Sequence, residues 1–259
     1  MDKKIAVVTG GSSGIGKSAA VKLAASGYRV YTLSRHETGA EGHIAADVAN
    51  AAQVREVFAR VFEREQRLDL LVNSAGMGIS GPIELTSEAD ARAIFDVNFF
   101  GMLNCVQAAL PYLRQTRDAR IINLSSVAAP LAIPYQAFYS ASKAAVNSLT
   151  KALANETARF GIRVSAVMPG DVRTGFTAAR RKTQGGALYP CADHAVEVME
   201  RDELGGMTPD AVASVVLRAA TSKRPKVLYV AGGKYKLFCL IEKLLPATLC
   251  NKLVGKIYN

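Results

Sequence analysis

The sequence predicts one α/β domain in which a doubly wound parallel sheet is covered by helices on both faces. Short apolar runs rich in β-branched residues alternate along the chain with longer helical patterns, and parallel strands require crossover helices of that kind. The first apolar run also ends in a glycine-rich turn that leads directly into a helix. With 259 residues, 49% of them hydrophobic, the chain is long enough for one large α/β domain.

The predicted elements follow one another from residue 4 to the end of the chain. Strands are expected at residues 4–9, 29–35, 68–73, 121–126, 162–168 and 226–230, with a further short apolar stretch before Asp47. Helices are expected from the glycine turn to Gly27 and at residues 51–65, 88–114 and 135–160. Pro111 would kink the third helix, and Gly161 would end the fourth. No internal repeat is visible, so residues 1–259 are expected to form a single domain.

A glycine-rich turn joins the first strand to the first helix. Gly10, Gly14 and Gly16 are spaced G-x-x-x-G-x-G, which differs from the G-x-G-x-x-G spacing of the common dinucleotide-binding turn. Glycine permits a tight turn and lets backbone N–H groups approach a pyrophosphate, which the positive end of a helix attracts. Placed between a strand and a helix, the turn indicates a Rossmann-type dinucleotide site.

The end of the second strand bears on the choice of cofactor. An NAD site typically places an acidic residue there to bind the ribose 2′-hydroxyl, whereas this strand ends in Ser34 and Arg35. A guanidinium can pair with a 2′-phosphate, so the sequence favours NADP(H) over NAD(H). Arg35 as a merely exposed residue is the alternative, and Glu37 keeps NAD(H) open.

Three residues in the middle of the chain form a candidate catalytic group. Tyr139 and Lys143 are four apart in a helical pattern and share a face, and Ser126 ends a predicted buried strand. Ligands of open α/β sheets bind at the carboxyl ends of strands. A nearby ammonium is expected to lower the pKa of Tyr139, which would let the phenol exchange a proton near neutral pH. The group therefore predicts proton transfer at a carbonyl oxygen, although a Tyr and a Lys at this spacing are common.

The composition bears on whether the protein binds a metal, nucleic acid or a membrane. The four cysteines are far apart and the three histidines are isolated, so we expect no metal site and no disulfide, and the free thiols favour a cytoplasmic location. The net charge of +10 is spread without a dense basic block, which favours a phosphate-rich ligand and no nucleic acid. The N-terminus lacks the apolar core of a signal peptide, and no stretch approaches the ~20 uninterrupted apolar residues of a membrane-spanning helix.

Over nearly its whole length the chain resembles the short-chain dehydrogenase/reductases. The resemblance depends on several motifs in one order. They are Thr9-Gly10-x-x-x-Gly14-Ile15-Gly16, Asp47, Asn73-Ser74-Ala75-Gly76, Asn98, Ser126, Tyr139-x-x-x-Lys143, and Pro169-Gly170 with Thr174. The family usually has a second asparagine where this chain has Ser74.

The resemblance implies a role for each cofactor-binding position. Gly10, Gly14, Ile15 and Gly16 would form the pyrophosphate turn, with Ser12 and Ser13 bonding phosphates, and Ser34 and Arg35 would face the adenosine 2′-phosphate. Asp47 and Val48 would flank the adenine, and Asn73, Ala75 and Gly76 would support the sheet and the adenosine ribose. Pro169, Gly170, Val172 and Thr174 would hold the nicotinamide end.

The resemblance also implies the catalytic roles. Tyr139 would be the acid/base, Ser126 would hold the substrate oxygen, and Lys143 would lower the Tyr139 pKa and bind the nicotinamide ribose. Asn98 would break its helix locally and anchor a water in a proton relay to Lys143; an ordinary helix asparagine is the alternative. A homodimer or homotetramer built on the helices at 88–112 and 137–160 is implied as well.

The last third of the chain is less informative. Residues 175–207 correspond to a mobile substrate lid in the family, and Arg180, Arg181 and Lys182 could meet an anionic substrate group there or form a solvated face. Residues 234–259 form two short amphipathic patterns divided by Pro246, which looks like the hydroxysteroid and retinol dehydrogenase branch. This tail would cover a hydrophobic pocket, or pack on the sheet or in an oligomer interface; contact with anionic lipid is less favoured.

Three hypotheses follow. The first is an NADP(H)-dependent oxidoreductase acting on the ketone or alcohol of a hydrophobic, steroid-like or lipid-like substrate. The second is a 3-oxoacyl thioester reductase of fatty-acid synthesis, for which the basic charge would suit an acidic carrier protein. The third is a non-catalytic NADP-binding regulatory protein, which the complete Ser-Tyr-Lys-Asn set disfavours.

Overall fold

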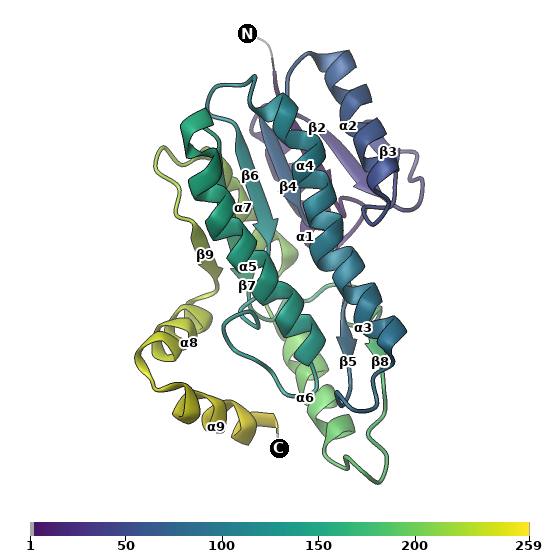
Figure 1. Ribbon diagram of the computed structural model, residues 1–259, viewed down its shortest axis with the longest axis vertical. Coiled ribbons are helices and arrows are strands. Elements are labelled where there is room, and N and C mark those ends of the chain that lie inside the picture. Colours follow the sequence, from purple (N-terminus) through teal and green to yellow (C-terminus); the bar gives the residue numbers. More distant parts are fainter. Residues whose placement is uncertain (1–2, 259) are drawn as a thin grey trace.

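A seven-stranded, wholly parallel sheet forms the centre of the computed structural model, which describes residues 3–258 (Figure 1). The strand order is β3-β2-β1-β4-β6-β7-β9, and every pairing along it is parallel. The strands are β1 (Lys4–Thr9), β2 (Tyr28–Ser34), β3 (His43–Ala45), β4 (Leu70–Asn73), β6 (Arg120–Leu124), β7 (Arg163–Pro169) and β9 (Leu228–Ala231). The predicted doubly wound fold is confirmed.

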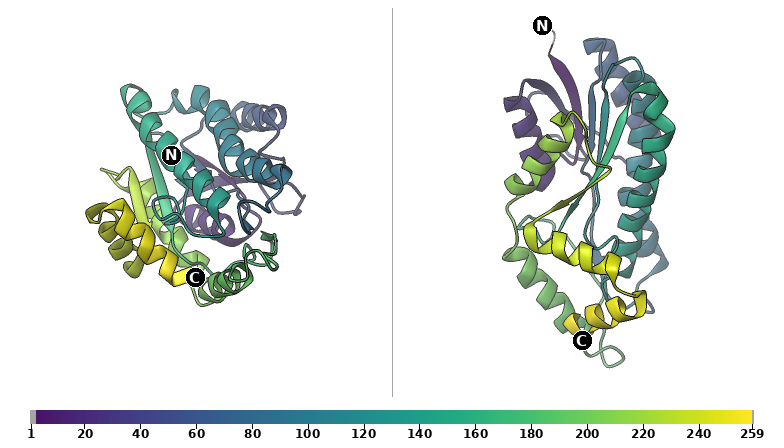
Figure 2. Two further views of the ribbon diagram at one scale, coloured as in Figure 1. Left: turned by 60° about the horizontal axis from the view of Figure 1, so that its bottom comes forward. Right: turned by 90° about the vertical axis from the view of Figure 1, so that its left-hand side faces the viewer.

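Helices cover both faces of this sheet, as Figure 2 shows in its right-hand view. One face carries α2 (Ala51–Glu65), α4 (Met102–Leu113) and α5 (Ala137–Thr157), and the other carries α1 (Gly14–Ala25) and α7 (Pro209–Thr221). Alternate residues of each strand point to opposite faces, so Ile5 and Val7 enter one core while Ala6 and Val8 enter the other. Burial on both faces explains why the strands are continuous apolar runs.

Two predicted element boundaries differ from the structure in ways that affect the site. The strand expected at 121–126 ends at Leu124, so Ser125 and Ser126 lie beyond it. The helix expected at 135–160 begins at Ala137, because Tyr135 has a positive φ of 59° that an α-helix excludes, and it ends in a 3₁₀ turn, η2 (Ala158–Phe160).

The helix expected at 88–114 is divided into three parts. It consists of α3 (Glu88–Phe95), the π-helical turn η1 (Asp96–Gly101) and α4, with Pro111 inside α4. Within the described residues, the stretch Glu88–Leu113 is long and apolar enough by composition to cross a membrane, with a mean hydropathy of 1.4. Because Cys105, Val106 and Ala109 of α4 lie in the core, we interpret it as a core helix.

Further elements lie at the carboxyl end of the sheet, and most of them belong to the last third of the chain. β5 (Ile79–Ser80) and β8 (Arg181–Lys182) form a separate two-stranded pair that the sequence did not predict. Next come α6 (Ala192–Leu204) and, after β9, the two tail helices α8 (Gly233–Leu244) and α9 (Ala247–Tyr258), separated at Pro246. Both tail helices lie near the carboxyl ends of β6 and β7 (Figure 1).

Candidate functional site

The predicted catalytic side chains meet just beyond the carboxyl end of β6. Ser126 lies in the turn after the strand, where its Oγ accepts a hydrogen bond from the Ala128 N–H at 3.1 Å. Tyr139 and Lys143 face this turn from the first two turns of α5, and Lys143 Nζ donates to the Leu124 carbonyl oxygen at 2.9 Å. The strand end and one face of the helix thus bring a hydroxyl, a phenol and an amine together.

Tyr139 lies among side chains that keep it protonated. Its ring centroid is 5.8 Å from that of Phe176, which belongs to the segment after β7. Burial raises the pKa of Tyr139 to about 12, although a hydrogen bond with the Ser126 side chain acts in the opposite direction. At neutral pH the residue is therefore a phenol that holds its proton.

The lowering of the Tyr139 pKa that Lys143 was expected to cause is not seen in this structure, and that role of the lysine stays a prediction. The lysine is buried, and burial lowers its own pKa to about 8. Its Nζ lies 5.7 Å from the Tyr139 ring centroid and bonds the Leu124 carbonyl. Burial is the largest cause of both pKa shifts, because each group lies away from water.

Asn98 lies in the π-helical turn η1, and both polar atoms of its side-chain amide make hydrogen bonds. Its Oδ1 accepts from the Met77 N–H at 2.8 Å, and its Nδ2 donates to the Met77 carbonyl at 3.0 Å and to Ser142 Oγ at 3.1 Å. A Cβ on Gly76 would lie 3.2 Å from Asn98 Oδ1 and 3.7 Å from Lys143 Nζ, so glycine permits this close approach. The water relay through Asn98 stays a prediction.

The turn after β1 has the shape of a pyrophosphate cradle. A Cβ on Gly16 would come within 2.2 Å of the Gly10 carbonyl oxygen, and Gly10 itself has a φ of +66°. The N-terminus of α1 has no side-chain cap, and Ser12 and Ser13 beside it are exposed. Uncapped N–H groups at a helix start favour an anion, so these residues fit a dinucleotide phosphate.

The ends of β1 and β4 are joined beside this cradle. Thr9 Oγ1 accepts from the Ser74 and Ala75 N–H groups at 3.0 and 3.1 Å. Asn73 Nδ2 donates to Asn123 Oδ1 at 2.9 Å, which links β4 to β6. Asn73 and Ala75 thus brace the central sheet.

The residues expected at the adenosine end are brought together only in part. Arg35 and Asp47 line one depression of about 390 Å³, with Ala45, Ala46 and Gln53. Arg35 is exposed and makes no ion pair within the described part of the chain, whereas the Ser34 hydroxyl bonds His43 and the His36 carbonyl. Val48 is 6% exposed and belongs to the core, so its side chain does not line this depression.

The loop after β7 meets the glycine turn at one point and the C-terminal tail at another. Thr174 Cγ2 lies 3.4 Å from where a Cβ on Gly14 would be, so these two predicted cofactor residues face each other. Gly170, next to Pro169, instead packs against the ring of Tyr235 in α8, and Val172 forms a bridge with Met207. Gly170 is therefore a packing residue as well as a member of the predicted site.

The basic residues of the segment 175–207 are bound to carboxylates of the protein itself. Arg180 is buried and paired with Glu203, Arg181 pairs with Asp90 at 2.8 Å, and Lys182 pairs with Glu200 at 2.6 Å. This arrangement does not support the suggestion that these three residues bind an anionic group of the substrate.

The buried Arg180–Glu203 pair predicts a measurable stability effect. Arg180→Met is expected to lower the free energy of unfolding by about 3 kcal/mol, because it leaves a partly buried carboxylate without its cation. Arg180→Met combined with Glu203→Gln is expected to recover part of that loss. Urea denaturation measures both, and an unchanged stability in the single variant would contradict the assigned pairing.

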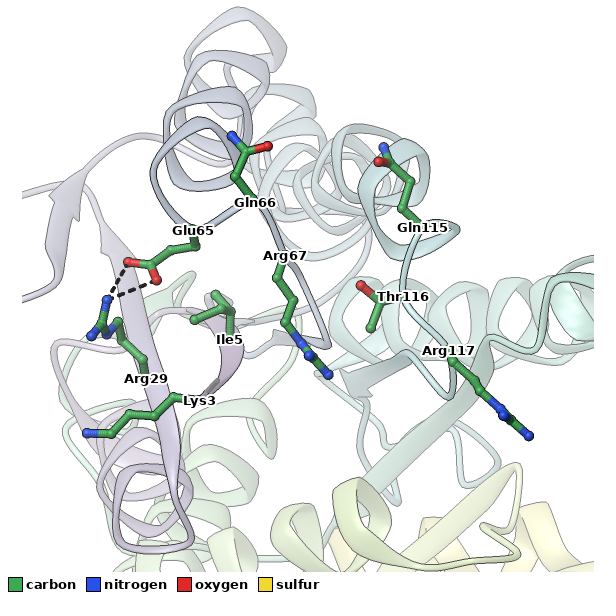
Figure 3. Close-up of a pocket in the computed structure, with 9 residues that line it drawn as sticks. All are labelled: Lys3, Ile5, Arg29, Glu65, Gln66, Arg67, Gln115, Thr116 and Arg117. Atoms are coloured by element: carbon green, nitrogen blue, oxygen red, sulfur yellow. Dashed lines mark hydrogen bonds and ion pairs between the residues drawn. The ribbon is translucent and has the colours of Figure 1, made fainter. Parts of the chain in front are cut away.

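A second depression, of about 700 Å³, lies at the opposite end of the sheet and is not part of this site. It is lined by residues from the start of β1, the end of α2 and the turn before β6, among them Lys3, Arg29 and Thr116. Figure 3 shows Arg29 directed at Glu65, where its Nη1 donates to both carboxylate oxygens at 3.0 and 2.9 Å. Ligands of parallel sheets bind at the carboxyl ends of strands, and this depression lies at the amino ends.

Three residues in or beside the site carried no signal in the sequence. Phe176 reaches Tyr139 from a separate segment, Gln53 holds the Asp47 N–H at 2.9 Å, and His43 accepts or donates at Ser34. None belongs to a motif, and their proximity results from chain crossings that local patterns do not reveal.

Known proteins resemble this chain along most of its length. The model of the short chain dehydrogenase family matches residues 4–185, which contain the glycine turn and all four predicted catalytic residues. The chain is 38% identical over 254 residues to a 3-ketodihydrosphingosine reductase of Bacteroides thetaiotaomicron, a match that covers 95% of this chain and 94% of the relative.

Two further similarities are to a curated relative and a solved structure. The chain is 40% identical over 190 residues to a 3-oxoacyl-acyl-carrier-protein reductase of Staphylococcus aureus, covering 68% of this chain and 77% of the relative. A short chain dehydrogenase/reductase from Burkholderia phymatum, solved in complex with NAD, has a TM-score of 0.81 at 28% identity, covering 94% of this chain and 92% of that one.

Proposed function

The chain belongs to the short-chain dehydrogenase/reductase family, and we propose that it reduces the ketone group of a hydrophobic, lipid-like substrate with NADP(H). As a member of that family it is an NAD(P)-dependent oxidoreductase that acts on ketone and alcohol groups. The observation that carries the proposal is the meeting of Ser126, Tyr139 and Lys143 beyond β6, next to a glycine cradle that fits a dinucleotide.

Each side chain has a defined task in the proposed reaction. The bound nicotinamide supplies the hydride. As the carbonyl is reduced, negative charge grows on its oxygen, where hydrogen bonds from Ser126 and Tyr139 would stabilise it. Tyr139 then gives its proton to that oxygen, and the Lys143 ammonium stabilises the phenolate left behind.

A lipid-like substrate is supported by the similarity to the 3-ketodihydrosphingosine reductase, which extends over 95% of this chain. The test compares rates on 3-ketodihydrosphingosine, a 3-oxoacyl thioester and a cyclic steroid ketone. We expect the highest kcat/KM on the long-chain ketone. A higher value on the thioester would favour the 3-oxoacyl reductase alternative, for which the similarity covers 68% of the chain.

The preference for NADP(H) is proposed from Arg35, an exposed guanidinium beside the adenosine depression. Arg35→Ala is expected to raise the Kd for NADPH by about 10-fold to 100-fold, because a charge-assisted contact with a phosphate is lost. The Kd for NADH should change little. Titration calorimetry measures both.

Arg60→Ala is the matched control, since Arg60 is an exposed arginine of α2 outside the depression. It removes the same charge and should leave both affinities unchanged. Equal binding of NADH and NADPH by the unaltered protein would refute the NADP(H) proposal and leave the reaction class intact.

We also propose a cytoplasmic location and a homo-oligomer. The location rests on four free cysteines in the described residues, two of which, Cys105 and Cys239, are buried. The dimer or tetramer would use α4 and α5, and light scattering of the purified protein tests it.

A further inference from the structure

We propose that α8 and α9 bind the surface of an anionic lipid bilayer and hold the catalytic site at that surface. The inference rests on the proposed function and deepens it, because it states where a lipid-like ketone would reach the enzyme. It starts from an apolar surface that the protein leaves uncovered.

α8 is apolar on two opposite faces, and only one of them packs on the protein. Tyr235 and Cys239, four residues apart, are buried in a small cluster with Val127 and Met168. Leu237, Leu240, Ile241 and Leu244 have the i, i+3, i+4, i+7 spacing of a second face, and they are 39–75% exposed. Such an exposed stripe needs an explanation, because monomeric proteins rarely show contiguous apolar patches of this kind.

α9 carries a second stripe of exposed apolar side chains. Leu249, Leu253 and Ile257 recur at spacings of four and are 45%, 46% and 61% exposed. Among the described residues, eight of the fifteen exposed large hydrophobic side chains belong to α8 and α9. We call these eight residues the tail ridge: Leu237, Phe238, Leu240, Ile241, Leu244, Leu249, Leu253 and Ile257.

Positive charge accompanies the tail ridge. Residues 233–258 contain five lysines and one glutamate, a net charge of +4. Lys234 lies 3.6 Å from Asp171, whereas Lys236, Lys243, Lys252 and Lys256 are exposed and make no ion pair within the described part of the chain. Apolar residues flanked by lysines are typical of helices that lie in the interface of an anionic membrane.

The same charge argues against a second copy as the occupant. A twofold dimer through this surface would place each patch against its twin and oppose two clusters of +4. Like charges across an interface weaken it, whereas anionic headgroups would pair with the lysines and neutralise them.

The tail is anchored beside the catalytic turn. Tyr235 Oη donates to Asp171, and the Tyr235 ring covers Gly170 in the loop after β7. The cluster under α8 includes Val127, the neighbour of Ser126, and α9 packs against α6. Figure 2 shows both tail helices at the carboxyl end of the sheet, so a bilayer on the tail ridge would lie near the site.

Co-sedimentation with vesicles tests the proposal on the full chain, without substrate or cofactor. The unaltered protein is expected to bind vesicles made of equal parts phosphatidylcholine and phosphatidylglycerol, and to bind phosphatidylcholine alone at least 10-fold more weakly. Leu240→Ser with Leu244→Ser should weaken binding at least 10-fold. Lys243→Gln, Lys252→Gln and Lys256→Gln together should weaken it by roughly 10²-fold.

Val21→Ser with Val227→Ser is the matched control, because these residues are 62% and 40% exposed outside the tail. It should bind like the unaltered protein. Failure of the unaltered protein to bind anionic vesicles would overturn the proposal, and so would equal binding by the leucine variant. Light scattering that shows an oligomer dispersed by the leucine changes, without vesicle binding, would assign the tail ridge to a second copy.

Failure of this inference is distinguishable from failure of the proposed function. On a water-soluble ketone, the leucine variant should keep the turnover of the unaltered protein. Vesicle binding with no reduction of any long-chain ketone would refute the substrate proposal alone. Long-chain ketone reduction with no vesicle binding would refute the bilayer proposal alone.

Discussion

Tyr139→Phe is expected to lower kcat/KM by about 10³-fold on any ketone that the unaltered protein reduces. The substitution removes the proton donor and one of two hydrogen bonds to the growing negative charge, and a general acid of this kind is worth about 10²–10⁴ in rate. The ring remains, so its contact with Phe176 and the binding of NADPH should persist. Steady-state kinetics and cofactor titration on the same preparation check both parts.

Tyr112→Phe is the matched control for this experiment. Its ring stacks on that of Phe62 in α2, with 4.5 Å between the ring centroids, and it lies near the end of α4, away from the carboxyl ends of the strands. It should leave kcat/KM unchanged. Removing a general acid should leave at most about a hundredth of the activity. If Tyr139→Phe kept more than about a tenth of it, Tyr139 would not be the proton donor.

Lys143→Met is expected to abolish most activity and at the same time to stabilise the fold. The pKa of Lys143 falls from 10.5 to about 8 on folding, so at pH 7 the native state holds a charge that its surroundings disfavour. A shift of this size corresponds to about 3 kcal/mol, and the lost hydrogen bond to Leu124 offsets about 1 kcal/mol of it. The variant should therefore be about 2 kcal/mol more stable at pH 7.

The pH dependence of this difference identifies its cause. Between pH 8 and 10.5 the unfolded chain binds a proton at Lys143 that the native protein has released, so the stability of the unaltered protein rises with pH relative to the variant. Above pH 10.5 the order should reverse, and the unaltered protein should be about 1 kcal/mol more stable than Lys143→Met, because only the hydrogen bond to Leu124 then distinguishes them. Urea denaturation at a series of pH values measures it, and a difference that stays constant with pH would mean that packing, not charge, is responsible.

The predicted positions of the candidate site residues agree with the structure where they depended on local pattern. Tyr139 and Lys143 share a helical face because residues four apart always do, and Ser126 follows a strand because an apolar run ends there. The glycine turn could be read in the same way, since a positive φ at Gly10 requires a residue without Cβ.

The sequence-based account failed where a property depended on distant segments. Burial raises the pKa of Tyr139, and Phe176, which packs beside the Tyr139 ring, lies 37 residues further along the chain. Arg180 was expected to meet an anionic substrate group or to lie on a solvated face, but it is buried and paired with Glu203 of α6. The side chain of Val48, expected to flank the adenine, is enclosed by the core, and its adenine contact stays a prediction.

By itself, the sequence determined the order of strands and helices, the cradle for a dinucleotide and the three side chains that converge beyond β6. These features depend on the period of the hydrophobic residues, on the glycine positions and on helical spacing. All three are properties of residues close together in the chain, so they can be recognised without knowing the fold. Only the tertiary structure decided which charges are desolvated, which basic residues are already paired and which apolar face of α8 stays exposed. The solvation of a side chain and its ion pairs depend on contacts with segments that are distant in the sequence. A local sequence pattern does not reveal those contacts.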